Sequence, residues 1–130
     1  MTHRTRRHFA PIALLFSVLA GCASTSAAQK TLAVGSSITL KSGEQATLSD
    51  GSSLRYGGLV ADSRCPEKTQ CIWAGDADIL FIYMNADGRS QEIHLHTHTE
   101  PKSIRVNGHT LVLEAVTRGS GARATVRLNP

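Results

Sequence analysis

The sequence predicts an all-β fold, an antiparallel β-sandwich or barrel of about seven or eight strands behind an apolar N-terminal segment. Two observations support this class. Short segments of alternating apolar and polar residues recur along the chain, and turns rich in Gly, Asn, Asp and Ser separate them. The three- and four-residue apolar spacing of an amphipathic helix is absent after the N-terminal segment.

The first element is a basic stretch followed by a short apolar run over residues 9–20. Small residues and a cysteine then close it, in the order Leu19-Ala20-Gly21-Cys22. This is the three-part layout of a secretory signal peptide, and the run is too short for a spanning helix, which needs about 20 residues. We therefore predict a cleaved signal helix over residues 1–21. Its end resembles a bacterial lipobox, in which Cys22 is lipidated and becomes the new N-terminus.

Two alternatives remain open for this segment. An ordinary signal peptide cleaved after Ala28 would leave no lipid. Arg6-Arg7 resembles a twin-arginine export motif, whose substrates fold in the cytosol before export. The cytosol is reducing and would not preserve a structural disulfide, so we favour an ordinary basic segment over this motif. The residue after Cys22 is Ala23 rather than Asp, which resembles the pattern of Gram-negative lipoproteins sent to the outer membrane. We expect a lipid anchor in the cell envelope, at the periplasmic face of that membrane.

Removal of the signal segment changes the charge balance. Three of the 14 basic residues lie within it, so 11 basic residues remain against 10 acidic ones. No basic run remains to indicate nucleic acid as a partner. Residues 22–30 comprise the lipidated cysteine and a small, polar stretch, which predicts a flexible tether. Residues 31–130 suffice for a single β domain with a modest core.

Eight segments of this domain have the composition of strands. They are residues 36–40, 45–48, 53–61, 79–84, 91–97, 103–106, 109–116 and 123–128. Turn residues separate several of them, and Asn107-Gly108 is the strongest hairpin signal. Residues 79–84 are apolar at every position, which predicts a strand buried on both faces.

Two cysteines lie between the third and fourth of these segments. With Cys22 lipidated, Cys65 and Cys71 are the remaining thiols, and an oxidising compartment favours a disulfide between them. A redox-active pair normally has two residues between its cysteines, whereas five separate Cys65 and Cys71. A metal site would need two further ligands, so a structural disulfide is favoured over both alternatives. Trp73 follows the bridge, and we expect its large apolar area to cover it.

Charged residues flank this loop on both sides. Asp62, Arg64, Asp76 and Asp78 are expected to cap turns and form ion pairs, because no further residue completes a catalytic mechanism. Asp62, Arg64 and Trp73 could also form a surface that the stapled loop presents to a partner, as in an inhibitor or an adhesin, since such loops are preorganised for binding.

The same segment carries a family resemblance. It reads Asp62-Ser63-Arg64-Cys65-Pro66, four residues, Cys71, one residue, and Trp73-Ala74-Gly75. It resembles a recurrent motif of small, functionally uncharacterised bacterial lipoproteins. The resemblance covers residues 62–75, the N-terminal segment and the β pattern. It implies an extracytoplasmic β domain with a disulfide-closed loop, and it implies no activity.

A row of histidines suggests a second possible function. His94, His96 and His98 alternate with Ile93 and Leu95, so on a strand the imidazoles share one face while the apolar pair faces the core. Same-face neighbours are roughly 6.5 to 7 Å apart, which lets two of the three meet on one ion. His109 is a candidate third ligand, and zinc or copper would suit such nitrogens. A solvent-facing polar row explains the same pattern without metal.

Enzyme motifs are missing from the sequence: we find no nucleophile elbow, phosphate-binding loop or dinucleotide fingerprint. We therefore assign no catalytic residue and no required cofactor. The prediction is a lipid-anchored envelope protein with a non-catalytic binding or structural role toward a protein or small-molecule partner. The alternatives are a zinc- or copper-binding protein that uses the histidine row, and an inhibitor or adhesin that uses the disulfide loop.

Overall fold

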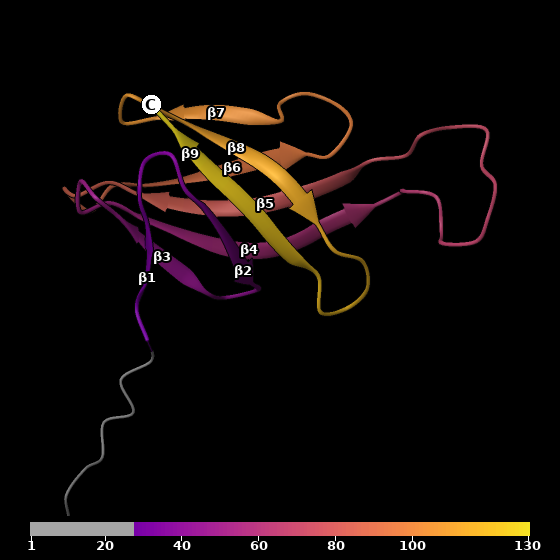
Figure 1. Ribbon diagram of the computed structural model, residues 1–130, viewed down its shortest axis with the longest axis horizontal. Helices are drawn as coiled ribbons and strands as arrows, with labels where there is room; N and C mark the ends of the chain where they lie inside the picture. The colour runs from indigo at the N-terminus through magenta and orange to yellow at the C-terminus, as the bar shows by residue number, and fades with distance from the viewer. Residues whose placement is uncertain (1–27) are drawn as a thin grey trace, which may run out of the picture.

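The computed structural model describes residues 28–130 of the 130-residue chain. The expected signal helix, Cys22 and most of the expected tether lie outside the described residues. The described part contains nine strands and no helix, and its two sheets pack face to face without closing into a barrel (Figure 1). This confirms the all-β class and identifies the sandwich. Within residues 28–130 no helix is long and apolar enough to cross a membrane.

The strands divide into a sheet of five and a sheet of four. The first sheet has the order β1 (Lys30–Leu32), β3 (Gln45–Leu48), β4 (Ser53–Asp62), β5 (Ala77–Met84) and β6 (Ser90–His96). The second has the order β2 (Ser37–Lys41), β9 (Arg123–Asn129), β8 (His109–Val116) and β7 (Ser103–Val106). Neighbouring strands are antiparallel, except for β1 and β3, which are parallel.

All eight predicted strands are present, with ends that agree to within two residues. The sequence-based prediction missed β1, which includes Lys30 from the expected tether. Three residues are too few to show an alternating pattern. This strand depends on pairing with β3, where Leu32 lies opposite Leu48 and both are buried.

The core lies between the two sheets, and β5 shows how it is made. Ile79, Phe81 and Tyr83 are buried on its inner face, and the ring centroid of Phe81 lies 5.4 Å from that of Tyr56 on β4. The prediction that residues 79–84 are buried on both faces is wrong. Leu80 and the other outward residues are only half-buried or exposed, because a two-layer sandwich places no third layer over the outer face of a sheet.

Two irregularities in β4 precede the long loop between β4 and β5. The pairing of β4 with β5 shifts register between Tyr56 and Gly58, and again between Leu59 and Ala61. Such bulges bend a strand and increase its twist. A Cβ atom on Gly57, the extra residue of the first bulge, would lie 3.0 Å from Leu80, so only glycine fits without a shift of that neighbour. The long loop that follows β4 extends beyond the end of both sheets (Figure 1).

Candidate functional site

The loop between β4 and β5, residues 63–76, is called the stapled loop here because a disulfide closes it. Cys65 and Cys71 are bonded, with their Cα atoms 5.8 Å apart, which confirms the predicted bridge. Inside the ring, the backbone N–H of Thr69 donates to the carbonyl oxygen of Pro66 at 3.2 Å and forms a turn. The bridge therefore encloses a short, turned segment at the outer part of the loop.

Two large apolar residues that follow the disulfide in the stapled loop are exposed. Ile72 is 97% exposed and Trp73 is 63% exposed. The expectation that Trp73 covers the disulfide is therefore wrong. The loop projects past the ends of the strands, where neither sheet offers an apolar layer for the indole to pack against (Figure 1).

Arg64 fixes one side of the loop base. Its Nε donates to Asp62 Oδ1 at 2.8 Å and its Nη2 to Asp62 Oδ2 at 2.6 Å, a two-pronged pair. The same guanidinium donates to the carbonyl oxygens of Val116 at 2.8 Å and Thr117 at 3.2 Å, at the end of β8 in the other sheet. Its side chain is only 13% exposed. Asp62 and Arg64 thus belong to the base of the loop, and the hydrogen bonds from Arg64 hold the pKa of Asp62 below its usual value.

Backbone contacts fix the other side of the base. Ser63 N–H donates to the carbonyl oxygen of Asp76 at 2.7 Å, and Asp76 N–H donates to Ser63 Oγ at 3.0 Å. Gly75 has a φ of +66°, and a Cβ atom there would lie 2.2 Å from the carbonyl oxygen of Ser63. Only glycine combines this backbone conformation with so close an approach of the two arms.

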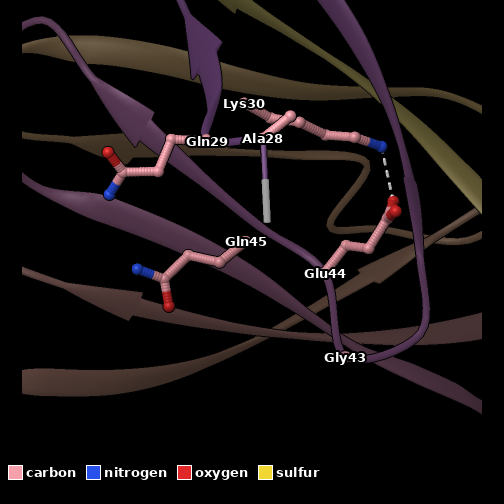
Figure 2. Close-up of a pocket in the computed structure, with 6 residues that line it drawn as sticks. All are labelled: Ala28, Gln29, Lys30, Gly43, Glu44 and Gln45. Carbon is pink, nitrogen blue, oxygen red and sulfur yellow. Dashed lines mark hydrogen bonds and ion pairs between the residues drawn. The ribbon is translucent and has the colours of Figure 1, made fainter. Parts of the chain in front are cut away.

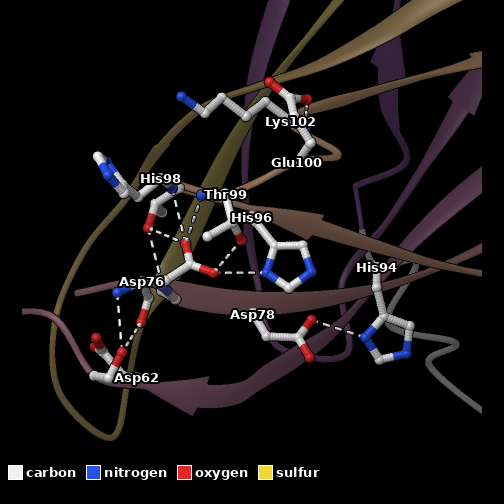
Figure 3. A network of polar contacts seen from close by, with 12 residues as sticks. Asp62, Asp76, Asp78, His94, His96, His98, Thr99, Glu100 and Lys102 are labelled. Atoms are coloured by element: carbon white, nitrogen blue, oxygen red, sulfur yellow. Dashed lines mark hydrogen bonds and ion pairs between the residues drawn. The ribbon is translucent and has the colours of Figure 1, made fainter. Parts of the chain in front are cut away.

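The carboxylate of Asp76 organises the segment that follows β6 (Figure 3). It accepts hydrogen bonds from His96 Nδ1 at 2.7 Å, His98 N–H at 2.8 Å, Thr97 Oγ1 at 3.1 Å and Thr99 Oγ1 at 2.8 Å. Burial would raise the pKa of Asp76, but these hydrogen bonds outweigh it and hold the pKa far below its usual value. Asp76 therefore joins the stapled loop to residues 97–99.

The histidine row is arranged partly as predicted. Ile93 and Leu95 are buried, while His94 and His96 lie on the outer face of β6. His94 Nδ1 lies 2.8 Å from Asp78 Oδ1, so both imidazoles have a carboxylate partner on or beside β5. His98 lies beyond the end of β6, on the far side of Asp76 from His94 (Figure 3).

His109 occupies the first position of β8, in the other sheet. Among residues 28–130, no three His, Cys, Asp or Glu side chains lie close enough together to hold a metal ion. The structure therefore brings His94 and His96 onto one surface, but it does not add His98 or His109 to a shared site.

Two cavities lie away from this region. The first, of about 340 Å³, lies beside β1 and is lined by Ala28, Gln29, Lys30, Gly43, Glu44 and Gln45 (Figure 2). Its two charged side chains neutralise each other, with Lys30 Nζ 2.5 Å from Glu44 Oε2. The second, of about 300 Å³, lies between the glycines of the β4 bulge and the β8–β9 turn. The hydroxyl of Ser42, which lines this cavity, donates to the carbonyl oxygen of Gly57 at 3.1 Å.

As predicted for the flanking charged residues, Asp62 and Arg64 form an ion pair and Asp76 caps the turn after β6, whereas Asp78 makes a hydrogen bond with His94. The central position of Asp76 was not foreseen, because its partners lie 20 to 23 residues away in sequence. Compared with protein families, with curated proteins and with solved structures, this chain has no match.

Proposed function

We propose that this chain is a lipid-anchored protein of the cell envelope with a non-catalytic binding role, and that Ile72 and Trp73 of the stapled loop contact its protein partner. One observation carries the binding proposal. Ile72 and Trp73, two large apolar residues at consecutive positions, are both exposed on a loop whose base is fixed by many hydrogen bonds.

The physical reason is the free-energy balance of binding. Tryptophan buries a large apolar area in an interface, and it is among the residues that most often dominate binding energy. A loop that is already ordered loses little conformational entropy when it binds. The disulfide, Arg64 and Asp76 restrain the loop before any partner arrives, so burial of Ile72 and Trp73 would add directly to affinity.

The position of the loop relative to the start of the domain fits an anchored protein. Lys30 on β1 lies in register with Ala46, which lies opposite Leu54 near the start of β4. The stapled loop follows the other end of β4, about 25 Å farther along the strand. The loop thus lies at the other end of β4 from the strand that follows the proposed anchor.

The anchor is tested by fractionation of cells. Replacing Cys22 with Ala should abolish labelling by a radioactive fatty acid and move the protein from the membrane fraction to the soluble fraction. A Cys22→Ala variant that stays in the membrane fraction contradicts the lipid anchor. The Cys65→Ser variant serves as the matched control, because it also replaces one cysteine but leaves the lipobox intact.

The binding surface is tested by site-specific photo-crosslinking in intact cells. A photoreactive phenylalanine analogue replaces Trp73 in one variant and Met84, an exposed apolar residue on β5, in the control. We expect a discrete cross-linked band with the probe at position 73, lost when Ile72 is also changed to Ser, and none with the probe at position 84. Equal bands at both positions, or no band at position 73, would overturn the assignment of Ile72 and Trp73 as the binding surface.

A further inference from the structure

We infer that the outer face of the four-stranded sheet docks on an acidic lipid membrane through Lys41, Arg105, Arg123 and Arg127. These four residues are called the basic face here. The anionic chemistry of the partner follows from the charges on the sheet, whereas the choice of a lipid surface rests on the proposed lipid anchor. The basic face lies on the other sheet from the strands that carry the stapled loop, so it is a second contact surface.

Alternation along the strands places the four basic side chains on one side of the sheet. On β9, buried residues alternate with Arg123 and Arg127, which are exposed. Lys41 on β2 and Arg105 on β7 are exposed as well, each next to a buried residue of the same strand. Neighbouring residues of a strand point to opposite faces, and the buried ones point into the core. The order β2, β9, β8 and β7 therefore collects all four charges on the outer face (Figure 1).

The charge of this sheet has the opposite sign to that of the rest of the domain. Its four strands carry four basic residues and one acidic residue, Glu114. All other residues within 28–130 together carry seven basic and nine acidic ones. A nearly neutral domain thus has a formal charge of +3 on one sheet and −2 elsewhere. This segregation gives one face a positive potential, which attracts acidic partners.

Lys41 and Arg123 show that the fold gains little from these charges. They lie directly opposite each other on β2 and β9. Like charges in such a cross-strand pair destabilise a sheet. Among the described residues, neither side chain has an acidic group within ion-pair distance. An anionic group seated between them would be attracted by both charges and would relieve their repulsion.

The centre of the face adds polar groups and a further free cation. Thr39 and Thr125, the next pair along β2 and β9, have their hydroxyl oxygens 2.8 Å apart. Arg127 follows on the same face with a 44% exposed side chain, and its one carboxylate neighbour, Glu114, lies only at the 4.0 Å limit of an ion pair. The face therefore offers hydroxyls as well as cationic donors to phosphate oxygens.

The shape of the basic face suits a flat array of anionic groups. Neither of the two cavities described above lies on it. Arg123 and Arg127 are about 13 Å apart along β9, and Lys41 and Arg105 lie on the two edge strands of the sheet. The headgroup phosphates of an acidic membrane form such an array, and each basic residue close to it strengthens binding.

The proposed anchor would bring the basic face to a membrane. Eight residues, 22–29, precede β1, and a chain of that length reaches roughly 29 Å when extended. Packed sheets lie about 10 Å apart, so this length lets the four-stranded sheet rest on the lipid surface. The stapled loop, which extends past the ends of the strands, would then project along the membrane. Binding through the basic face alone is salt-sensitive, so it would not hold a Cys22→Ala chain in a membrane fraction washed with high salt.

The test is co-sedimentation of the full chain with vesicles of phosphatidylcholine, alone or in an equal mixture with phosphatidylglycerol. Every protein carries Cys22→Ala, so acylation does not contribute and the N-terminal segment contributes equally. We expect binding to the acidic vesicles that weakens with added salt. Lys41→Gln/Arg123→Gln should lower the partition coefficient about 25-fold, because each basic residue near an acidic surface contributes roughly fivefold. Arg55→Gln/Arg89→Gln is the matched control, since it removes the same charge from the other sheet and its hairpin, and it should bind as the parent does.

Circular dichroism verifies that both double variants are folded. Equal losses in the two double variants would show that net charge alone controls binding, and would overturn the basic face. Equal binding of the parent to neutral and acidic vesicles would overturn it too. If Lys41→Gln/Arg123→Gln weakens binding to heparin, a soluble polyanion, but not to the vesicles, the partner is an anionic polymer and the lipid surface is overturned. The proposed anchor is judged separately by fatty-acid labelling at Cys22, because the vesicle assay uses chains without acylation.

Discussion

Ser63 and Asp76 hold the two arms of the stapled loop together through reciprocal contacts, Ser63 N–H to Asp76 O at 2.7 Å and Asp76 N–H to Ser63 Oγ at 3.0 Å. The side chain of Asp76 then extends the connection to residues 97–99. One residue thus links the end of the stapled loop, the start of β5 and the end of β6. Variants at this junction should affect both stability and the order of the loop.

Stability should depend on pH through Asp76. Its pKa in the folded protein lies below the ordinary value of 3.8, so the unfolded chain binds a proton first as the pH falls. The stabilisation is complete above about pH 5 and is lost progressively as the pH falls through 3.8 toward the folded pKa. At neutral pH we expect Asp76→Asn to lower the free energy of unfolding by about 2 kcal/mol, as for hydrogen bonds to a charged group.

The measurement is urea denaturation of the wild type and Asp76→Asn at neutral pH and at several values between pH 5 and pH 3. The difference in unfolding free energy between the two proteins should shrink as the pH falls. Protonation of Asp76 removes from the wild type the charged hydrogen bonds that Asp76→Asn already lacks. A difference that stays constant over this range would show that the charge of Asp76 does not contribute to stability.

Gly75 should tolerate no side chain. Gly75→Ala would place a Cβ atom 2.2 Å from the backbone oxygen of Ser63, so the two arms of the loop must separate. We expect Gly75→Ala to lower the free energy of unfolding by at least about 3 kcal/mol, more than an ordinary surface substitution does. Gly88→Ala is the matched control, because Gly88 also has a positive φ but open space around its Cα. Gly88→Ala should lower the free energy of unfolding by only about 1 kcal/mol, through backbone strain. Thermal denaturation of both variants tests this, and equal losses would contradict it.

Removal of the disulfide should act mainly on the loop. The bridge spans a sequence separation of only 6, and closing so short a loop contributes about 2 kcal/mol. We expect Cys65→Ser to lower the free energy of unfolding by about that amount. Amide exchange should rise most within residues 66–73 and little in the core strands. Faster amide exchange throughout β4 and β5 would instead show that the bridge stabilises the core strands as well as the loop.

Tyr56 should tolerate loss of its hydroxyl. Its side chain is fully buried between the sheets, and among the described residues its OH has no hydrogen-bond partner. Burial raises the pKa of this phenol above its usual value, although the charge of Arg64 opposes the shift. Tyr56→Phe keeps the ring that packs on Phe81 and removes an unsatisfied polar atom, so the free energy of unfolding should stay the same or rise slightly. A loss above about 1 kcal/mol in chemical denaturation would indicate that the hydroxyl is satisfied.

The sequence by itself determined the β class, eight of the nine strands within residues 28–130, and the bridge between Cys65 and Cys71. These features follow from short-range patterns. Alternation places side chains on opposite faces of a strand, turn residues fix where strands end, and the number of cysteines limits the pairing. The outward placement of His94 and His96 follows from the same alternation. Cys22 and its signal segment lie outside the described residues, so the lipid anchor stays a prediction.

Only the tertiary structure decided the other features of the site. The strand β1 exists because β3 lies beside it, and Trp73 is exposed because the stapled loop extends past both sheets. Asp76 became a centre of hydrogen bonds because the pairing of β5 with β6 brings residues 97–99 to the base of the loop. Each of these outcomes depends on contacts between distant parts of the chain. A local pattern fixes which way a side chain points, but the packing of sheets decides what it meets there.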